Sequence, residues 1–331
     1  MFNRVARRSA VVLGIVTLGL VSGCAGEDLA RSNYQRTTIT AEPGSSPGEV
    51  PTGEITDPAV AASALRTVDP CGLLTEDTLG DVGSTTEDPY ASDWGECRAS
   101  NIKDAGGKTV GISLNLGDSL VTTDNATGGI EGLPLIEDPL DEETCFVTAV
   151  TSRGPAAGIA TQVTYPGGNA CNAGYTVLQK VIQAVRADPP QYEQRAGTAL
   201  AVDPCASVEE SAVSKVLGDG ALRSPSGLHA CRYQGDSRGP SVSVRMRLGY
   251  PPDNKEGTPV DLGRGVKATQ QASDSGNSSC KVEWQHLGVS DDEGEIISVS
   301  YDDYSDAADV KKSCEGALAM AKGVVPKLPS T

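Results

Sequence analysis

The chain has few aromatic residues and few histidines. Aromatic side chains are 4% of the 331 residues, and Phe146 is the sole phenylalanine beyond the first 23 residues. The core must therefore consist mainly of valine, leucine and alanine. His229 and His286 are the only histidines, which leaves a hydrolase little choice of general base.

Metal-binding patterns are also missing from the sequence. No Cys-x-x-Cys pair occurs, and no acidic run has the Asp-x-Asp-x-Asp-Gly spacing and distal glutamate of a calcium loop. The acidic segments at 138–144, 290–295 and 301–309 are therefore predicted to be solvated hairpins. We expect no metal and no cofactor.

The sequence also lacks an apolar run long enough to span a bilayer, which takes about 20 residues. The longest such run covers 10–21 and follows three arginines in the first eight residues, as in a signal peptide. Arg7-Arg8 occurs in twin-arginine signals too. Ser9-Ala10 stands where those signals carry a bulky apolar residue, so general Sec export is favoured.

Val21-Ser22-Gly23-Cys24 resembles a bacterial lipobox. It predicts a signal peptide at 1–23 and a diacylglycerol on the sulfur of Cys24. Two acyl chains would anchor the mature protein to the cell membrane on its extracytoplasmic face. The alternatives are a secreted protein cleaved nearby and an uncleaved anchor with an incidental cysteine.

Positive charge is scarce after the signal. Removing 1–23 takes away three arginines and no acid, which changes the formal net charge from −17 to −20. Nucleic acid and anionic lipid head groups should repel such a chain. We therefore expect no nucleic-acid partner, and membrane attachment only through the lipid on Cys24.

Residues 24–66 are predicted to be a disordered tether. The stretch AEPGSSPGEVPTGEITDP, within this segment, is rich in Pro, Gly, Ser, Thr and Glu and has few large apolar residues. Such a composition cannot bury enough surface to offset the entropy of ordering.

Val-Asp-Pro-Cys occurs at 68–71 and again at 202–205, and the cysteine spacing repeats with it. If Cys24 carries lipid, eight cysteines remain, four in each half of the chain. The first two in each half are 26 residues apart, the second and third 48 or 49, and the last two 26 or 34. This agreement indicates two homologous domains, at 67–190 and 200–328.

The local patterns of the halves agree as well. Asp-Pro at 69–70 and 203–204 predicts a capped helix start, although Ser207 with Glu210 also matches a capping box. Each half closes with an amphipathic helix, around 177–185 and 310–325. Between the helices lie strand-like segments at 96–100, 110–116, 144–152, 160–166, 230–235, 241–250, 279–288 and 296–304.

These patterns predict an α+β fold of two homologous disulfide-stapled domains, each a helix, an antiparallel sheet of about four to five strands, and a helix. Four cysteines allow three pairings, and the sequence cannot choose among them. Sequential pairing within each domain is our hypothesis. Its pairs are Cys71 with Cys97, Cys145 with Cys171, Cys205 with Cys231, and Cys280 with Cys314.

A lipobox, a tether and then DPCGLLTEDTLGDVG at 69–83 resemble the actinobacterial lipoproteins grouped as domain-of-unknown-function family 3558. DPCASVEESAVSKVLG at 203–218 is a weaker second copy, because Ser207-Val208-Glu209 replaces Leu-Leu-Thr. The resemblance implies an envelope lipoprotein without an assigned activity. Two copies depart from the family's usual single domain.

Signatures of catalysis are weak. Gly-x-Ser-x-Gly occurs at 44–48, in the tether, and at 235–239, between two predicted strands before a proline. Neither has the strand–turn–helix context of a nucleophile elbow. Ser237 with His229 would be the one catalytic pairing to consider, and a hairpin turn is the favoured interpretation.

The sequence therefore favours a non-enzymatic envelope lipoprotein that binds a ligand or partner, with a groove between the domains as one possible location. An envelope protein, a wall polymer or a small ligand are the candidate partners. A structural or accessory subunit is the alternative, and a hydrolase ranks third.

Overall fold

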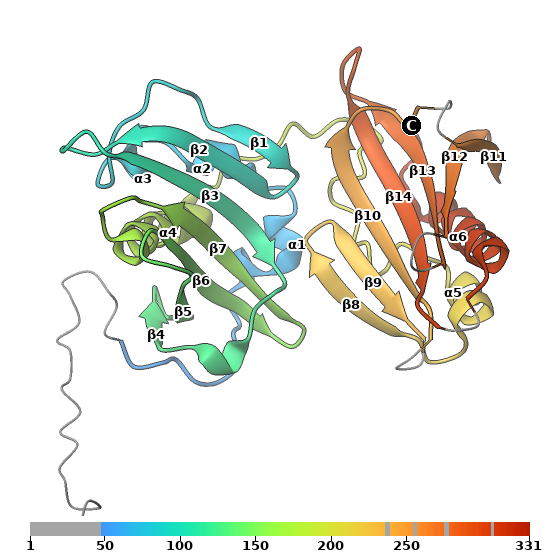
Figure 1. Ribbon diagram of the computed structural model, residues 1–331, viewed down its shortest axis with the longest axis horizontal. Coiled ribbons are helices and arrows are strands. Elements are labelled where there is room, and N and C mark those ends of the chain that lie inside the picture. The colour runs from blue at the N-terminus through green and yellow to red at the C-terminus, as the bar shows by residue number, and fades with distance from the viewer. Residues whose placement is uncertain (1–47, 236–238, 254–256, 275–277, 306–307) are drawn as a thin grey trace, which may run out of the picture. The chain divides into compact units, whose positions relative to one another are not determined.

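A computed structural model describes residues 48–331 except 236–238, 254–256, 275–277 and 306–307 (Figure 1). It contains two antiparallel seven-stranded sheets, one in each repeat. The predicted α+β class is confirmed, whereas the predicted four to five strands per sheet are too few.

The first sheet has the strand order β1-β2-β3-β7-β6-β5-β4. Its strands are β1 (Tyr90–Asp93), β2 (Glu96–Lys103), β3 (Thr109–Asp118), β4 (Gly128–Ile130), β5 (Leu133–Pro139), β6 (Thr144–Arg153) and β7 (Ala156–Thr164). A short 3-10 helix, η3 (Thr123–Asn125), lies between β3 and β4 in the chain.

The second sheet, written from β8, has the order β8-β9-β10-β14-β13-β12-β11. Its strands are β8 (Leu222–Gly227), β9 (Ala230–Gln234), β10 (Ser241–Gly249), β11 (Thr258–Gly263), β12 (Val266–Ser273), β13 (Ser278–Gly288) and β14 (Gly294–Asp303). Matched in chain order, its strands follow one another as those of the first sheet do. The two repeats therefore share one topology.

All eight strand-like segments of the sequence are strands, and the six that escaped prediction lie toward the sheet edges. They are β1, β4, β5, β8, β11 and β12. β1, β8 and β11 bury at most one residue each, so the alternation of apolar and polar residues is weak in them. Prolines in β5, β8 and β11 also argue for turns at the level of sequence.

One long helix covers a face of each sheet. In the first repeat, α4 (Ala170–Ala187) packs on β6 and β7 and lies behind them in Figure 1. Asn169 caps its start by accepting a hydrogen bond from the Asn172 amide at 2.9 Å. In the second repeat, α6 (Val310–Val324), followed by η4 (Val325–Lys327), packs on β13 and β14.

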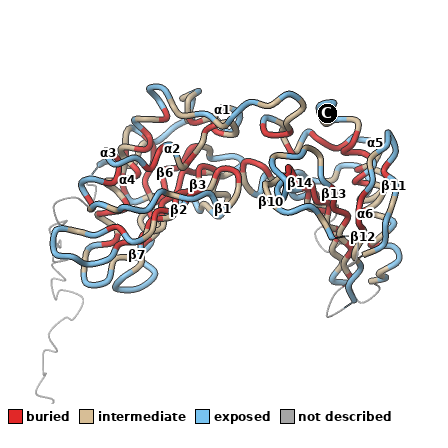
Figure 2. The backbone as a smooth tube through the Cα atoms, turned by 90° about the horizontal axis from the view of Figure 1, so that it is seen from above, coloured by how far each residue is buried: buried red, intermediate tan, exposed pale blue. Residues whose placement is uncertain are grey.

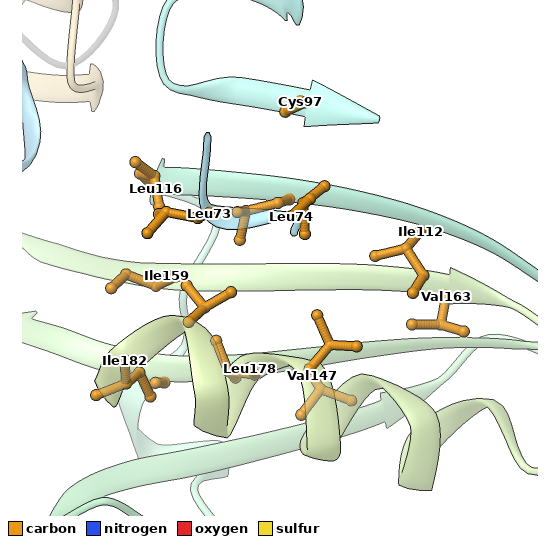
Figure 3. Packing of buried hydrophobic residues seen from close by; sticks show 14 of the residues in the cluster. Leu73, Leu74, Cys97, Ile112, Leu116, Val147, Ile159, Val163, Leu178 and Ile182 are labelled. Carbon is orange, nitrogen blue, oxygen red and sulfur yellow. The ribbon is translucent and has the colours of Figure 1, made fainter. Parts of the chain in front are cut away.

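Each core lies between a helix and a sheet. In the first repeat, Leu178 and Ile182 of α4 lie beside Val147 and Ile159 of the sheet (Figure 3). Figure 2, which colours the backbone by burial, shows buried residues concentrated in the central strands of both repeats.

The predicted opening helix is two short helices in the first repeat. They are α2 (Pro70–Leu73) and α3 (Glu76–Leu79). Asp69 accepts from the Cys71 amide at 2.9 Å, as a capping residue should. Asp203 makes the same contact with the Cys205 amide, but a turn follows it and α5 (Glu210–Leu217) begins later.

The packed part of the chain begins before residue 67. A 3-10 helix, η2 (Pro58–Val60), and α1 (Ala62–Leu65) precede it, and both Val60 and Leu65 are buried in the first core. Farther upstream, Arg153 of β6 donates hydrogen bonds to the carbonyls of Gly53 and Pro51. The last part of the segment predicted as a tether is thus packed on the first repeat.

Four disulfides are present, and they follow the sequential pairing. Each disulfide joins a strand to a helix of the same repeat. In Cys205–Cys231, a turn takes the place of the helix. The bonds are Cys71–Cys97, Cys145–Cys171, Cys205–Cys231 and Cys280–Cys314. Disulfides in this number are typical of an oxidising, extracytoplasmic compartment.

Cys24 and the signal peptide lie outside the described residues. Among the helices that the structure describes, none has the length and hydropathy needed to cross a bilayer.

Candidate functional site

The first sheet carries an open groove of about 440 Å³. Its floor is the sheet face turned away from α4, because Phe146 and Gln162 line it whereas their neighbours Val147 and Val163 are buried in the core. Sites for small ligands typically have volumes of roughly 300–1,000 Å³. The groove is therefore large enough to hold one.

Strand register arranges the floor as two rows of side chains across five strands. We define the first row as Asp138, Phe146, Gln162, Ser113 and Arg98, from β5 to β2. The second row is Ile136, Thr148, Ala160, Asn115 and Glu96. Cross-strand neighbours in such a row are about 5 Å apart.

The segment that follows β3 forms one wall of the groove. Leu120, Val121 and Asn125 line it from this side. A side-chain carbon added to Gly158 would meet Val121 Cγ2 at 3.3 Å and Thr148 Cγ2 at 2.6 Å. The wall can approach the sheet because residue 158 has no side chain.

The centre of the floor is apolar and its ends are charged. Phe146, Ile136 and Ala160 are neighbours on β6, β5 and β7. At the two ends of the first row, the side chains of Asp138 and Arg98 make no hydrogen bond or ion pair with any described residue. A ligand can therefore engage both charges without breaking an existing contact.

The remaining carboxylates of the groove have weak local partners. Glu96 accepts a hydrogen bond from the Ser92 hydroxyl at 3.1 Å. Asp118 accepts one from the Leu120 amide at 2.9 Å. With Asp138 they give the groove three carboxylates against the single guanidinium of Arg98, so its net charge is negative.

The equivalent face of the second sheet has the same two rows with different side chains. Its first row is Gln271, Lys281, Ser300, Ser243 and Arg232. Its second row is Thr269, Glu283, Ser298, Arg245 and Ala230. Lys281 replaces Phe146 and Glu283 replaces Thr148, so the apolar centre is lost. Ile296 stands where the first repeat has Gly158.

Charged side chains on that second face have partners within the protein. Glu283 accepts from Lys281 and Arg247, each at 3.1 Å. Arg245 pairs with Asp93, and Arg232 donates to the Ser241 hydroxyl at 3.1 Å. The second face therefore satisfies its own charges, whereas the first leaves Arg98 and Asp138 open.

A second cavity of about 410 Å³ is lined by residues of both repeats, where the sequence allowed for a binding groove. His229 lies in its wall, buried, with its ring centroid 5.1 Å from that of Trp94. Neither ring nitrogen has a hydrogen-bond partner among the described residues. Burial lowers the pKa of His229 to about 3, and the charge of Arg66 acts in the same direction.

The described residues provide no catalytic geometry for the hypothetical pair of Ser237 and His229. Ser237 lies outside the described residues, and the low pKa of His229 makes it a poor base near neutral pH. His286 is held by the Gly197 carbonyl, 2.9 Å from its Nε2 atom.

Two of the acidic segments contain hairpin turns, whereas the third, predicted as a hairpin, leads from β14 to α6, which Asp309 caps by accepting a hydrogen bond from the Lys311 amide at 2.9 Å. Asp141 accepts from the amides of Glu143 and Thr144, at 2.8 and 2.7 Å, and closes the hairpin between β5 and β6. In the hairpin that joins β13 and β14, the backbone carbonyl of Glu293 accepts from the amides of Val289 and Ser290. No cluster of three or more metal-ligating side chains occurs within the described ranges.

Sequence reasoning missed the groove. Its floor comes from five strands, and two of its residues, Ile136 and Asp138, lie on β5, a strand that was not predicted. The one available signal was Phe146, an isolated phenylalanine on the polar side of an alternating segment.

Comparison with known proteins adds little. No family model and no curated protein matches the chain. Among solved structures, DynU16, a protein from the dynemicin biosynthetic locus, is similar at 10% sequence identity. The match covers 83% of this chain and 96% of that one, with a TM-score of 0.17.

Proposed function

We propose that this protein is a lipid-anchored, extracytoplasmic binding protein without enzymatic activity, and that the groove on the first sheet is its ligand site. The observation that carries the proposal is the contrast between the two repeats. One topology is used twice, and in the part of the chain that the structure describes the first copy alone combines an apolar floor, unpartnered charges and open volume.

The membrane part of the proposal depends on the sequence. The lipobox at 21–24 gives the anchor, and the four disulfides agree with export. The second repeat then acts as a scaffold, because its equivalent face is occupied by its own ion pairs.

A thermal-shift screen tests this function. The mature chain with Cys24 replaced by serine is melted with pools of wall glycans, lipids and peptides. A ligand at about 100 times its dissociation constant adds roughly 2.7 kcal/mol to the free energy of unfolding, which raises the melting temperature.

F146K is the matched variant, since it puts into the first groove the residue type that the second repeat has at 281. We expect the stabilising pools to lose their effect on F146K. A flat response to every pool in the unchanged protein would overturn the binding function and favour the accessory role. Stabilisation that persists in F146K would place the ligand elsewhere.

A further inference from the structure

We infer that the groove on the first sheet takes a basic peptide in extended conformation, lying across the strands with one or two aliphatic side chains on Phe146 and Ile136. This inference rests on the proposed function and specifies its ligand class.

Charge is the first argument. Asp138 ends the first row on β5, and Glu96 ends the second row on β2, with the apolar floor between them. Four strand spacings of about 4.8 Å separate β5 from β2, so the two carboxylates are roughly 19 Å apart along the groove. Arg98 also lies on β2, but Glu96 and, on the neighbouring strand β3, Asp118 outnumber its guanidinium at that end. A ligand that matches this pattern is positive at both ends and apolar in the middle.

Extended peptides have the matching spacing. Residues rise about 3.3 Å each, and every second side chain lies on one face. Seven residues with lysine at both ends and aliphatic residues at the third and fifth positions therefore place two cations about 20 Å apart. Both aliphatic side chains then face the floor.

The polar side chains of the floor suit a peptide backbone. Gln162 and Ser113 stand between Phe146 and Arg98 in the first row, and their side chains have no hydrogen-bond partner among the described residues. A carboxamide and a hydroxyl can each donate and accept, as exposed peptide groups require. Arg98, on β2 like Glu96, donates only, which suits a backbone carbonyl at that end of the peptide.

Phe146 makes the test direct, because it is the only phenylalanine of the mature chain. Mature protein labelled with 4-fluorophenylalanine gives one fluorine resonance, from the centre of the groove. K281F adds a second resonance at the equivalent position of the other repeat, which serves as an internal control.

The probe is acetyl-Lys-Ala-Leu-Ala-Leu-Ala-Lys-amide. Two controls keep its length, one with glutamate in place of both lysines and one with serine in place of both leucines. We expect the lysine–leucine peptide to shift the Phe146 resonance in a saturable way and to leave the resonance added by K281F unchanged. The glutamate peptide should bind at least tenfold more weakly, and the serine peptide should cause no shift.

Two further variants, D138N and E96Q, test the ends of the groove. Each is expected to weaken the lysine–leucine peptide about two- to fivefold at low salt, as for exposed charge pairs. Circular dichroism and the unchanged K281F resonance check that the variants fold.

Equal affinity for the lysine and glutamate peptides, or equal shifts of both fluorine resonances, would overturn the inference. If no peptide shifts Phe146 while a glycan or lipid stabilises the protein in a way that F146K abolishes, the ligand class is wrong and the proposed function stands. If the thermal screen is flat as well, both fall.

Discussion

Trp94 of the first repeat packs on His229 of the second, with the ring planes tilted by 51°. Trp94 belongs to the buried cluster of the second repeat, and Leu228, next to His229, belongs to that of the first. Arg66 adds a hydrogen bond to the Leu228 carbonyl at 3.1 Å. Each repeat thus contributes one large side chain to the other's core.

This contact predicts a loss of stability in acid. The pKa of His229 is about 3 in the folded protein and 6.5 when exposed, so the unfolded chain binds a proton first as the pH falls. The stabilisation that neutral His229 contributes to the folded protein is fully present above pH 6.5 and decreases as the pH falls to 3. At pH 5 the loss is about 2 kcal/mol in the free energy of unfolding.

Denaturant unfolding between pH 7.5 and 5 measures this loss. H229F keeps an aromatic ring against Trp94 and removes the titrating group, so its stability should change less with pH. The same slope in H229F and the unchanged protein would contradict the role given to His229.

A glycine on β3 provides a second test of the contact between repeats. A side-chain carbon on Gly117 would lie 2.4 Å from Leu228 Cγ and 2.9 Å from the Leu228 amide nitrogen. The amide nitrogen is a backbone atom and cannot move aside. We expect G117A to destabilise the protein by about 1–3 kcal/mol, as overpacking does. Chemical denaturation measures this loss of stability, and we expect proteases to cleave the segment 188–200 faster in G117A.

Gly111 is the matched control, since it lies on the same strand and a side-chain carbon there would meet no atom within 4 Å. G111A should stay within about 0.5 kcal/mol of the unchanged protein. If the two alanine variants unfold alike, Leu228 does not press on β3 as the structure indicates.

The sequence predicts the local features of this fold better than the distant ones. The four-residue spacing of Val177, Val181 and Val185 identifies α4, because helix periodicity is a property of the segment itself. The groove depends on which residue of β6 lies beside which residue of β5 and β7. That register is set by pairing between strands far apart in the sequence, and a one-residue slip would turn Phe146 into the core.

A half-buried acid on β5 predicts a stabilising substitution. Burial raises the pKa of Glu137, and its Oε1 atom has no hydrogen-bond partner among the described residues. Above the pKa of an exposed glutamate, the charged Glu137 carboxylate therefore destabilises the folded state. E137Q should raise the free energy of unfolding at pH 7, because glutamine carries no charge that burial would destabilise.

The gain from E137Q should shrink as the pH falls toward the raised pKa, because Glu137 is then neutral in the folded protein too. Melting curves at pH 7 and pH 4.5 measure the difference. E142Q, at an exposed glutamate in the following turn, is the control and should change neither value. A larger gain in acid than at pH 7 would show that burial does not destabilise the Glu137 carboxylate.

Disulfides at equivalent positions of the two repeats should contribute nearly equally to stability. Cys145–Cys171 and Cys280–Cys314 each join a central strand to the long helix, across 26 and 34 residues. In the chain-entropy model each is worth about 3–4 kcal/mol, and the longer loop adds less than about 0.5 kcal/mol. The double variants C145A/C171A and C280A/C314A should therefore lose similar amounts in guanidinium unfolding. A difference above about 2 kcal/mol would mean that the repeats do not depend alike on their long helices, which the shared topology leads us to expect.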